Sequence, residues 1–256
     1  MRVVVCCKAV PIDTKIESVQ IVNGDIQFRD TEFYINEFDA YALDTALTLK
    51  KLCGAETIAL TVGPLRAQEV LYIAIAKGID RVLRIDGETI RPELIASGLI
   101  PVLQEIHPDL ILAGAHSEDW MGGEVGIYLA QALNLGVAYA VIEICDLNST
   151  HIRIKKEIGG GKLAEVRLKL PAVLCVQSGI QPLSYVSMIK RQKARNTLIK
   201  LGGELDRASV MQALSGMAGY GLKKVSVPSE KAHAVMIQGD RSEMVSKILD
   251  IIKNVI

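Results

Sequence analysis

The chain has 256 residues, half of them hydrophobic, which is enough for one large core or a core with an appended segment. Lys plus Arg equals Asp plus Glu at 29 each, so no overall charge attracts nucleic acid or an anionic membrane. No apolar run reaches the length of a signal-peptide core or a membrane span, so we expect a cytoplasmic protein without stable membrane insertion. Five cysteines without metal-ligand spacing predict reduced core thiols and no metal site.

The first elements of the chain are a strand, a hairpin and a helix. Val3 to Cys7 is a short β-branched apolar run, typical of a parallel strand buried on both faces. Residues 19–28 alternate in polarity around Asn23-Gly24, which predicts a hairpin. Asn36 can cap a helix that carries an apolar stripe, and Gly54 can end it.

Strands and helices then alternate along most of the chain. We expect strands at 57–62, 81–85, 110–113, 138–145 and 173–176, helices at 65–77, 92–106 and 124–133, and a hairpin of 151–157 with 164–170. Repeated strand–helix units predict an α/β fold with a mostly parallel sheet and right-handed crossovers.

The pattern weakens from Ser178 onward, where Pro and Gly residues interrupt the chain. We therefore expect a nucleotide-binding domain at 1–177 and an extended C-terminal arm at 178–256, ending in a helix from Ser242 to Val255. Such an arm predicts a partner to wrap, since it retains apolar side chains at Leu183, Met188, Ile189, Leu198, Ile199 and Leu201.

Ligands of parallel sheets bind beyond the carboxyl ends of the strands, so the loops after Cys7, Val62 and Ala113 should share one edge. The loop from Gly114 to Gly123 lies between a strand and a helix, and its small residues let backbone N–H groups approach a phosphate. It matches neither a Walker A loop nor a GxGxxG fingerprint. The loop could therefore be either a plain connection between strand and helix or a phosphate-binding loop.

Several blocks, in order and spacing, resemble the beta subunits of electron-transferring flavoproteins. They are the opening Val-Cys-Cys-Lys-Ala-Val-Pro-Ile-Asp, Tyr34 to Ala42, Val62-Gly63-Pro64, Ala76 to Arg81, Leu168 to Val173, and Met188 to Lys193. The resemblance spans about the first two hundred residues. Chain length and the Ser117–Asp119 pair are most similar to the Fix-type branch.

The resemblance implies a Rossmann-like, adenine-nucleotide-binding domain that docks an alpha subunit, with the redox FAD at their interface. A second nucleotide, AMP or FAD, would be bound in this chain, and FAD would accompany electron bifurcation. By position its contacts would be Cys6, Ala9, Asn36, Phe38, Asp39, Val62, Gly63, Gly114, His116, Ser117, Asp119, Gly122, Gly123, Glu124 and Val125.

Three residues depart from the family pattern at the phosphate loop. Met121, Gly122 and Glu124 stand where many members have an acidic residue, a threonine and a glutamine. A glutamate beside a phosphate is unfavourable unless it points away or a cation intervenes. We expect FAD ahead of AMP, because the resemblance is to the Fix-type branch and because Gly122-Gly123 clears side-chain volume near the phosphates.

The resemblance also implies a docking segment for an acyl-CoA or related flavin dehydrogenase, just before the basic stretch 190–195. The family's apolar anchor falls on Tyr185, with Met188 and Lys190 beside it. Tyr185 could instead pack on this protein's own surface, and the basic stretch could be a solvated helix face.

Four residues of the candidate site also have plain structural interpretations. Asp119 could simply hydrogen-bond the loop or helix start, and His116 could be a solvated loop residue. Cys6 and Cys7 point to opposite faces of a strand, which predicts core packing. Trp120 could stack on a ring of the nucleotide or cover a hydrophobic edge.

The resemblance implies an electron-transfer subunit that shuttles electrons from flavin dehydrogenases to an acceptor, not a stand-alone enzyme. Such a subunit needs no triad, metal cluster or general base, and none stands out in the sequence. The alternative is a nucleotide-hydrolysing or adenylylating α/β enzyme, for which Lys8 and Asp119 are the candidate residues. A nucleotide-sensing module would leave the arm unexplained.

Overall fold

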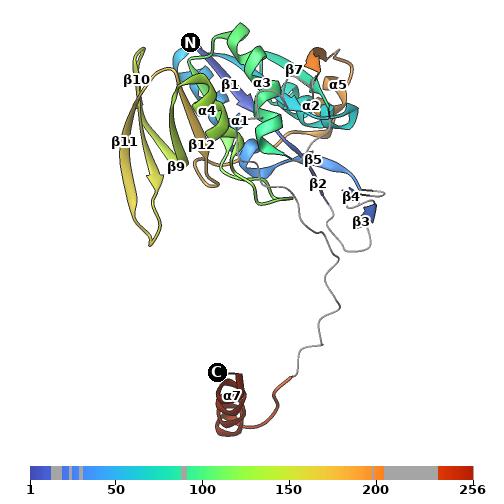
Figure 1. The fold of residues 1–256 in the computed structure, drawn as a ribbon, viewed down its shortest axis with the longest axis vertical. Coiled ribbons are helices and arrows are strands. Elements are labelled where there is room, and N and C mark those ends of the chain that lie inside the picture. The colour runs from blue at the N-terminus through green and yellow to red at the C-terminus, as the bar shows by residue number, and fades with distance from the viewer. Residues whose placement is uncertain are drawn as a thin grey trace. The chain divides into compact units, whose positions relative to one another are not determined.

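A computed structural model of the chain describes residues 1–12, 19–22, 25–28, 31–87, 91–197, 199–204 and 236–255. The described residues form two compact units. The first contains a nine-stranded sheet in the order β11-β10-β9-β12-β8-β1-β6-β7-β13 (Figure 1). Its strands are β1 Arg2–Cys6, β6 Glu56–Val62, β7 Arg81–Asp86, β8 Leu110–Gly114, β9 Gly136–Leu147, β10 His151–Glu157, β11 Leu163–Lys169, β12 Ala172–Val176 and β13 Lys200–Glu204.

The sheet is mostly parallel, as the sequence predicts. Parallel pairing joins β9 to β12, β12 to β8, β8 to β1, β1 to β6, β6 to β7 and β7 to β13. β10 pairs antiparallel with both β9 and β11, so the predicted hairpin extends one end of the sheet. This combination is a Rossmann-like α/β fold with an antiparallel extension.

Helices cover both faces of the sheet (Figure 1). On one face α1 Glu37–Cys53 and α2 Gln68–Lys77 pack against a core that includes Val3 and Val5. On the other face α3 Pro92–Ile106 and α4 Val125–Leu133 pack against a core that includes Val4 and Cys6. The continuous apolar run of β1 serves both cores because successive side chains of a strand point to opposite faces.

The predicted helix ends are largely correct. Gly54 and Gly78 end α1 and α2 in the left-handed conformation, with φ of 68° and 108°. This conformation favours glycine because glycine has no Cβ. Asn36 does precede α1, but the prediction that it caps the helix is wrong: its side chain makes no capping hydrogen bond and reaches another loop.

Several short elements escaped sequence-based prediction. β2 Ala9–Pro11 and β5 Phe33–Ile35 form a small antiparallel pair, and a 3₁₀ turn at Leu65–Ala67 precedes α2. β3 Val19–Val22 and β4 Asp25–Phe28 form the predicted hairpin, whose Asn23-Gly24 turn lies outside the described residues. β2–β5 pairing brings the segment after β1 next to the start of α1.

Residues after 177 contribute to the first unit. α5 Met188–Ala194 packs on α2, and β13 pairs with β7, although we expected an extended arm here. β13 has the sequence KLGGE, and its two glycines hide the strand pattern. Leu198 and residues 205–235 lie outside the described part, and a partner-wrapping arm stays a prediction.

The second unit contains the C-terminal helix. α7 spans Arg241–Val255, close to the prediction, and exposes apolar side chains that include Val245, Ile248 and Ile252. Among the described helices, none is both long and apolar enough to cross a membrane.

Candidate functional site

The carboxyl ends of β8, β1 and β6 lie side by side, so the three predicted loops share one edge of the sheet. Lys8 and Ala9 follow β1, Gly63 follows β6, and the loop 115–124 leads from β8 to α4. Asn36, Phe38 and Asp39 join them at the start of α1, where the Asn36 N–H donates to the Lys8 carbonyl at 3.0 Å. Predicted site residues far apart in the sequence therefore meet here.

The Asp39 carboxylate ties two strand ends together. Its Oδ2 accepts from the Lys8 N–H at 2.8 Å, and its Oδ1 accepts from the Gly114 N–H at 2.8 Å. Asp39 is only 5% exposed. Burial raises the pKa of this carboxyl from 3.8 to about 7, against the opposing effect of the two N–H groups.

We expect Asp39 to make the chain less stable as pH rises. Its folded pKa lies above its unfolded value, so its stabilising contribution is complete below pH 3.8 and is lost as pH rises through about 7. The native state then binds up to one extra proton, a slope of at most about 1.4 kcal/mol per pH unit.

Urea unfolding of wild type and Asp39→Asn at several pH values measures this slope. The free energy of unfolding of the wild type should fall relative to the variant across this window. If the difference in free energy of unfolding between wild type and variant stays the same across this pH window, the Lys8 and Gly114 N–H groups hold Asp39 ionised at every pH tested.

Asn36 joins the start of α1 to the loop after β8. Its Nδ2 donates to the His116 carbonyl at 2.9 Å, and its Oδ1 accepts from the Glu118 N–H at 3.1 Å. The Phe38 and His116 rings lie 3.9 Å apart between centroids. The expectation that His116 is solvated is therefore corrected: it is partly buried against Phe38.

Lys8 brings a cation to the same loop. Its Nζ donates to Asp119 Oδ1 at 2.7 Å and to Ser117 Oγ at 3.3 Å. Asp119 Oδ1 also accepts from the Trp120 N–H at 2.9 Å, so its loop-bonding interpretation is correct in this structure. The sequence suggests Lys8 as a candidate only for the alternative enzyme, although its place directly after β1 points to this site. The Asp119 carboxylate offsets the positive charge of Lys8, which weakens the case for a nucleotide-hydrolysing or adenylylating enzyme.

Two glycines of the loop are required by close contacts. A Cβ at Gly114 would lie 2.5 Å from Asp39 Oδ1, and a Cβ at Gly123 would lie 2.2 Å from the Ala115 carbonyl oxygen. At Gly122 the nearest atom to such a Cβ is Glu124 Oε2, at 3.1 Å. The loop is thus held close to the sheet, directly before the positive start of α4.

The third loop has a polar interior. Arg84 Nη1 donates to the Gly63 carbonyl at 2.7 Å, and Arg84 also pairs with Asp86. Thr61 Oγ1 and Arg84 Nε are buried without a hydrogen-bond partner among the described residues. Buried polar atoms normally have partners, so these two atoms are exceptions near the ends of β6 and β7.

Cys6 and Cys7 are buried in the two opposite cores, as predicted, and burial raises the pKa of the Cys6 thiol to about 12. They are therefore unreactive packing residues. Among the described residues, no group of His, Cys, Asp or Glu side chains could hold a metal ion.

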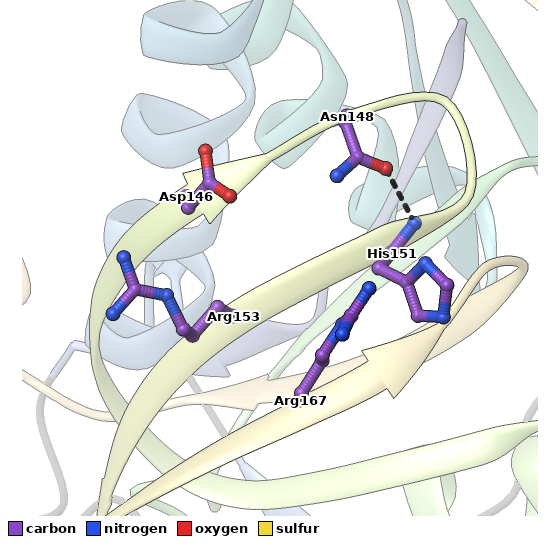
Figure 2. A pocket seen from close by; sticks show the side chains of 5 residues that line it. All are labelled: Asp146, Asn148, His151, Arg153 and Arg167. Carbon is purple, nitrogen blue, oxygen red and sulfur yellow. Dashed lines mark hydrogen bonds between the residues drawn. The ribbon is translucent and has the colours of Figure 1, made fainter.

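A pocket of about 300 Å³ lies away from these loops, on the antiparallel extension. Figure 2 shows its lining side chains Asp146, Asn148, His151, Arg153 and Arg167. Arg153 and Arg167 are register partners, and Glu165 accepts from Arg153 at 2.7 Å. The pocket contains none of the predicted site residues.

Of the predicted docking residues, Tyr185 lies between β12 and α5, and Met188 and Lys190 lie in the first turn of α5. Tyr185 is 86% exposed and Met188 is 72% exposed, and Lys190 is exposed as well. Tyr185 therefore does not pack on the described surface of this chain. The basic stretch is only partly solvated, because Arg191 and Arg195 both pair with Glu69 of α2.

The sheet order and the convergence of Lys8, Asn36, Asp39 and the loop before α4 define a Rossmann-like α/β protein with a candidate ligand site at its strand ends. Comparison with known families then gives a match to the electron transfer flavoprotein domain over residues 26–200. The chain belongs to this family of electron-transfer proteins.

Relatives match along most of their length. The chain is 31% identical over 230 residues to the electron transfer flavoprotein subunit beta of Methylophilus methylotrophus, covering 85% of each chain. It is 24% identical over 246 residues to the protein of the same name from Bacillus subtilis (strain 168), covering 93% of each. Against that of Bradyrhizobium diazoefficiens it is 26% identical, with 89% of this chain and 90% of the relative covered. The predicted family is confirmed.

Proposed function

We propose that this chain is the beta subunit of an electron transfer flavoprotein, works as a heterodimer with an alpha subunit, and relays electrons from a flavin dehydrogenase to an acceptor. The match to beta-subunit relatives over 85% or more of both chains carries the proposal. The redox FAD would lie at the interface with the alpha subunit. A cytoplasmic location, a Fix-type affiliation and electron bifurcation belong to the same proposal.

The chain itself would hold an adenine nucleotide at the edge formed by the loops after β1, β6 and β8. Small loop residues, backbone N–H groups and the start of α4 suit its phosphates. Lys8 adds a cation within 2.7 Å of Asp119, and that cation lessens the cost of acidic residues near a phosphate. Asn36 and Phe38 would contact the nucleotide from the start of α1, and His116 from the loop before α4.

FAD bound at the interface would supply the redox chemistry, while this chain positions it and contributes the docking surface. FAD rather than AMP in the chain's own site is supported by the Fix-type resemblance and by the absence of a side chain at Gly122, whereas Gly123 is packed against the Ala115 carbonyl and the Tyr139 side chain. The Glu124 carboxylate lies next to Gly122, where a phosphate would be disfavoured unless that carboxylate turns away.

The nucleotide content of the purified complex tests both parts. Co-expressed with its alpha subunit, the chain should purify as a yellow heterodimer, and denaturation should release two FAD molecules per heterodimer. Chromatography of the released nucleotides against standards measures this. One FAD with stoichiometric AMP would refute FAD in the beta site. No adenine nucleotide beyond the interface FAD would refute the site itself, and a monomer that ignores the alpha subunit would refute the heterodimer.

Docking of a flavin dehydrogenase of the acyl-CoA dehydrogenase type is proposed for the surface around Tyr185, Met188 and Lys190. Tyrosine offers a large contact area with few rotatable bonds, which suits an anchor in a partner's pocket. Exposed apolar neighbours such as Ile189, 71% exposed, favour a protein partner for this surface.

A further inference from the structure

The segment from Gln181 to Ser187 links β12 to α5 without regular secondary structure. It carries the most exposed residue of the proposed docking surface, Tyr185. A free loop of this kind would lose conformational entropy when a partner binds it. The contacts on either side of Tyr185 indicate that the segment is already ordered in the folded chain, so that less conformational entropy remains to be lost on binding.

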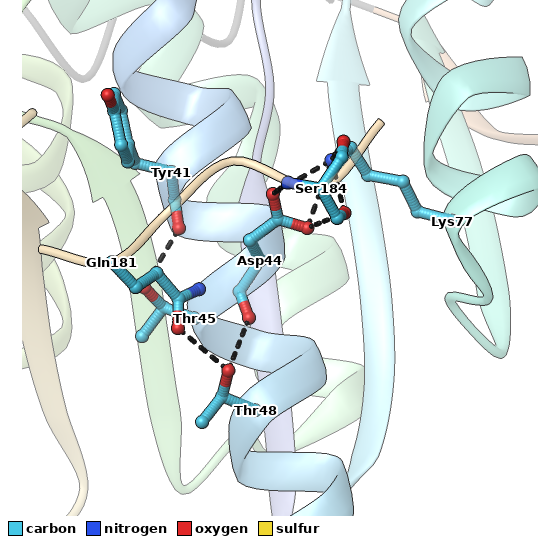
Figure 3. A network of polar contacts seen from close by, with 7 residues as sticks. All are labelled: Tyr41, Asp44, Thr45, Thr48, Lys77, Gln181 and Ser184. Atoms are coloured by element: carbon cyan, nitrogen blue, oxygen red, sulfur yellow. Dashed lines mark hydrogen bonds and ion pairs between the residues drawn. The ribbon is translucent and has the colours of Figure 1, made fainter. Parts of the chain in front are cut away.

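A buried ion pair lies directly beneath the segment. Lys77 of α2 and Asp44 of α1 are bonded at 2.8 Å, with side chains only 5% and 6% exposed. Lys77 Nζ also donates to the Ser184 carbonyl at 2.8 Å and contacts Ser184 Oγ at 2.9 Å. Figure 3 shows Ser184 directed into this pair from the segment above the helix.

Asp44 completes the contact from the other side. Its Oδ2 accepts from the Ser184 N–H at 2.7 Å, and its Oδ1 accepts from the Ser184 hydroxyl at 2.6 Å. One turn further along α1, Thr48 donates to Gln181 Oε1 at 2.7 Å (Figure 3). Both backbone polar groups of the residue before Tyr185 are therefore bonded to a buried ion pair.

The far side of the docking surface is fixed by α5. Arg191 and Arg195 both donate to Glu69 Oε2 of α2, at 3.0 and 2.9 Å. Arg191 also lies over the Tyr34 ring, 5.6 Å from its centroid. Helix α2 thus anchors the chain through Lys77 before Tyr185 and through Glu69 after it.

We propose that Asp44 and Lys77 are positioning residues that hold the docking surface of Tyr185, Met188 and Lys190 in its partner-binding conformation. The inference rests on the proposed docking function. A buried ion pair gives little net stability, because desolvation offsets the attraction, so geometric specificity is the better account of its position. The Asp44–Lys77 pair orients the backbone segment that carries Tyr185. Because this segment is ordered before the partner arrives, less entropy is lost on binding.

Steady-state electron transfer by the purified heterodimer tests this inference. The electron donor is the acyl-CoA dehydrogenase, chosen from a purified panel, that reduces the wild type fastest. Lys77→Met should raise the KM for the heterodimer roughly tenfold, with kcat and flavin content unchanged. Hydrogen exchange should accelerate at the Ser184 N–H, which a docking contact alone would not affect.

Three further variants make the result decisive. Asp44→Asn combined with Lys77→Met leaves no unpaired buried charge and should reproduce the higher KM if the single variant folds poorly. Ser184→Ala removes only the hydroxyl contacts and should give a smaller rise. Lys50→Met is the matched control, because Lys50 of α1 pairs with Asp80 at the surface and does not touch the segment.

An unchanged KM in the double variant, while Tyr185→Ala raises it, would overturn the positioning role and leave the proposed docking function standing. Unchanged exchange at Ser184 would overturn it as well. If Tyr185→Ala also leaves the KM unchanged, or no donor reduces the wild type, the docking function fails and the inference fails with it.

Discussion

Gly114→Ala is expected to lower the melting temperature by roughly 5–10 °C and to empty the proposed nucleotide site. An added Cβ would lie 2.5 Å from Asp39 Oδ1, 2.7 Å from Phe38 Cβ and 3.1 Å from Asn36 Nδ2. Relief of these contacts requires α1 to move away from β8, which breaks the bond between the Gly114 N–H and Asp39. Overpacking of this kind typically costs about 1–3 kcal/mol.

Thermal unfolding and release of bound nucleotide measure the two effects of Gly114→Ala. Gly136→Ala is the matched control, because its Cβ would meet Leu168 Cδ2 at 3.5 Å, an ordinary contact. The control should keep the wild-type melting temperature and nucleotide content. A Gly114→Ala protein that melts as the wild type and keeps its nucleotide would contradict the close packing at this strand end.

Tyr185→Ala should weaken binding of the dehydrogenase roughly thirtyfold, since truncation of a buried anchor typically costs about 2 kcal/mol or more. The side chain is 86% exposed in the free chain, so its removal should leave the melting temperature and flavin content unchanged. Titration of the heterodimer against the dehydrogenase measures the affinity, and flavin reduction at limiting protein measures its consequence.

Leu52→Ala is the control for Tyr185→Ala, because Leu52 of α1 is also strongly exposed, at 77%, and lies outside the proposed docking surface. It should bind the dehydrogenase as the wild type does. If Tyr185→Ala instead loses flavin or melts earlier, with affinity per folded molecule intact, Tyr185 contributes to packing and the anchor assignment is wrong.

The sequence by itself determined the α/β class, the parallel core of the sheet and the family. β8, β12 and the part of β1 after Arg2 are continuous apolar runs, and such runs indicate strands buried on both faces. Gly54 and Gly78 mark helix ends because the required backbone conformation is local. The loops after β1, β6 and β8 were predictable as neighbours because the carboxyl ends of parallel strands lie at one edge of the sheet.

Only the tertiary structure decided which side chains meet. Asn36 looked like a helix cap, but its amide bonds the loop 116–118, about 80 residues away. Asp44 meets Lys77 across 33 residues and Ser184 across 140. Such contacts depend on how α1 and α2 pack on the sheet, and no local pattern encodes that packing. From the sequence alone, a polar residue on a helix is therefore expected to be solvated, and only the folded structure shows that it is buried.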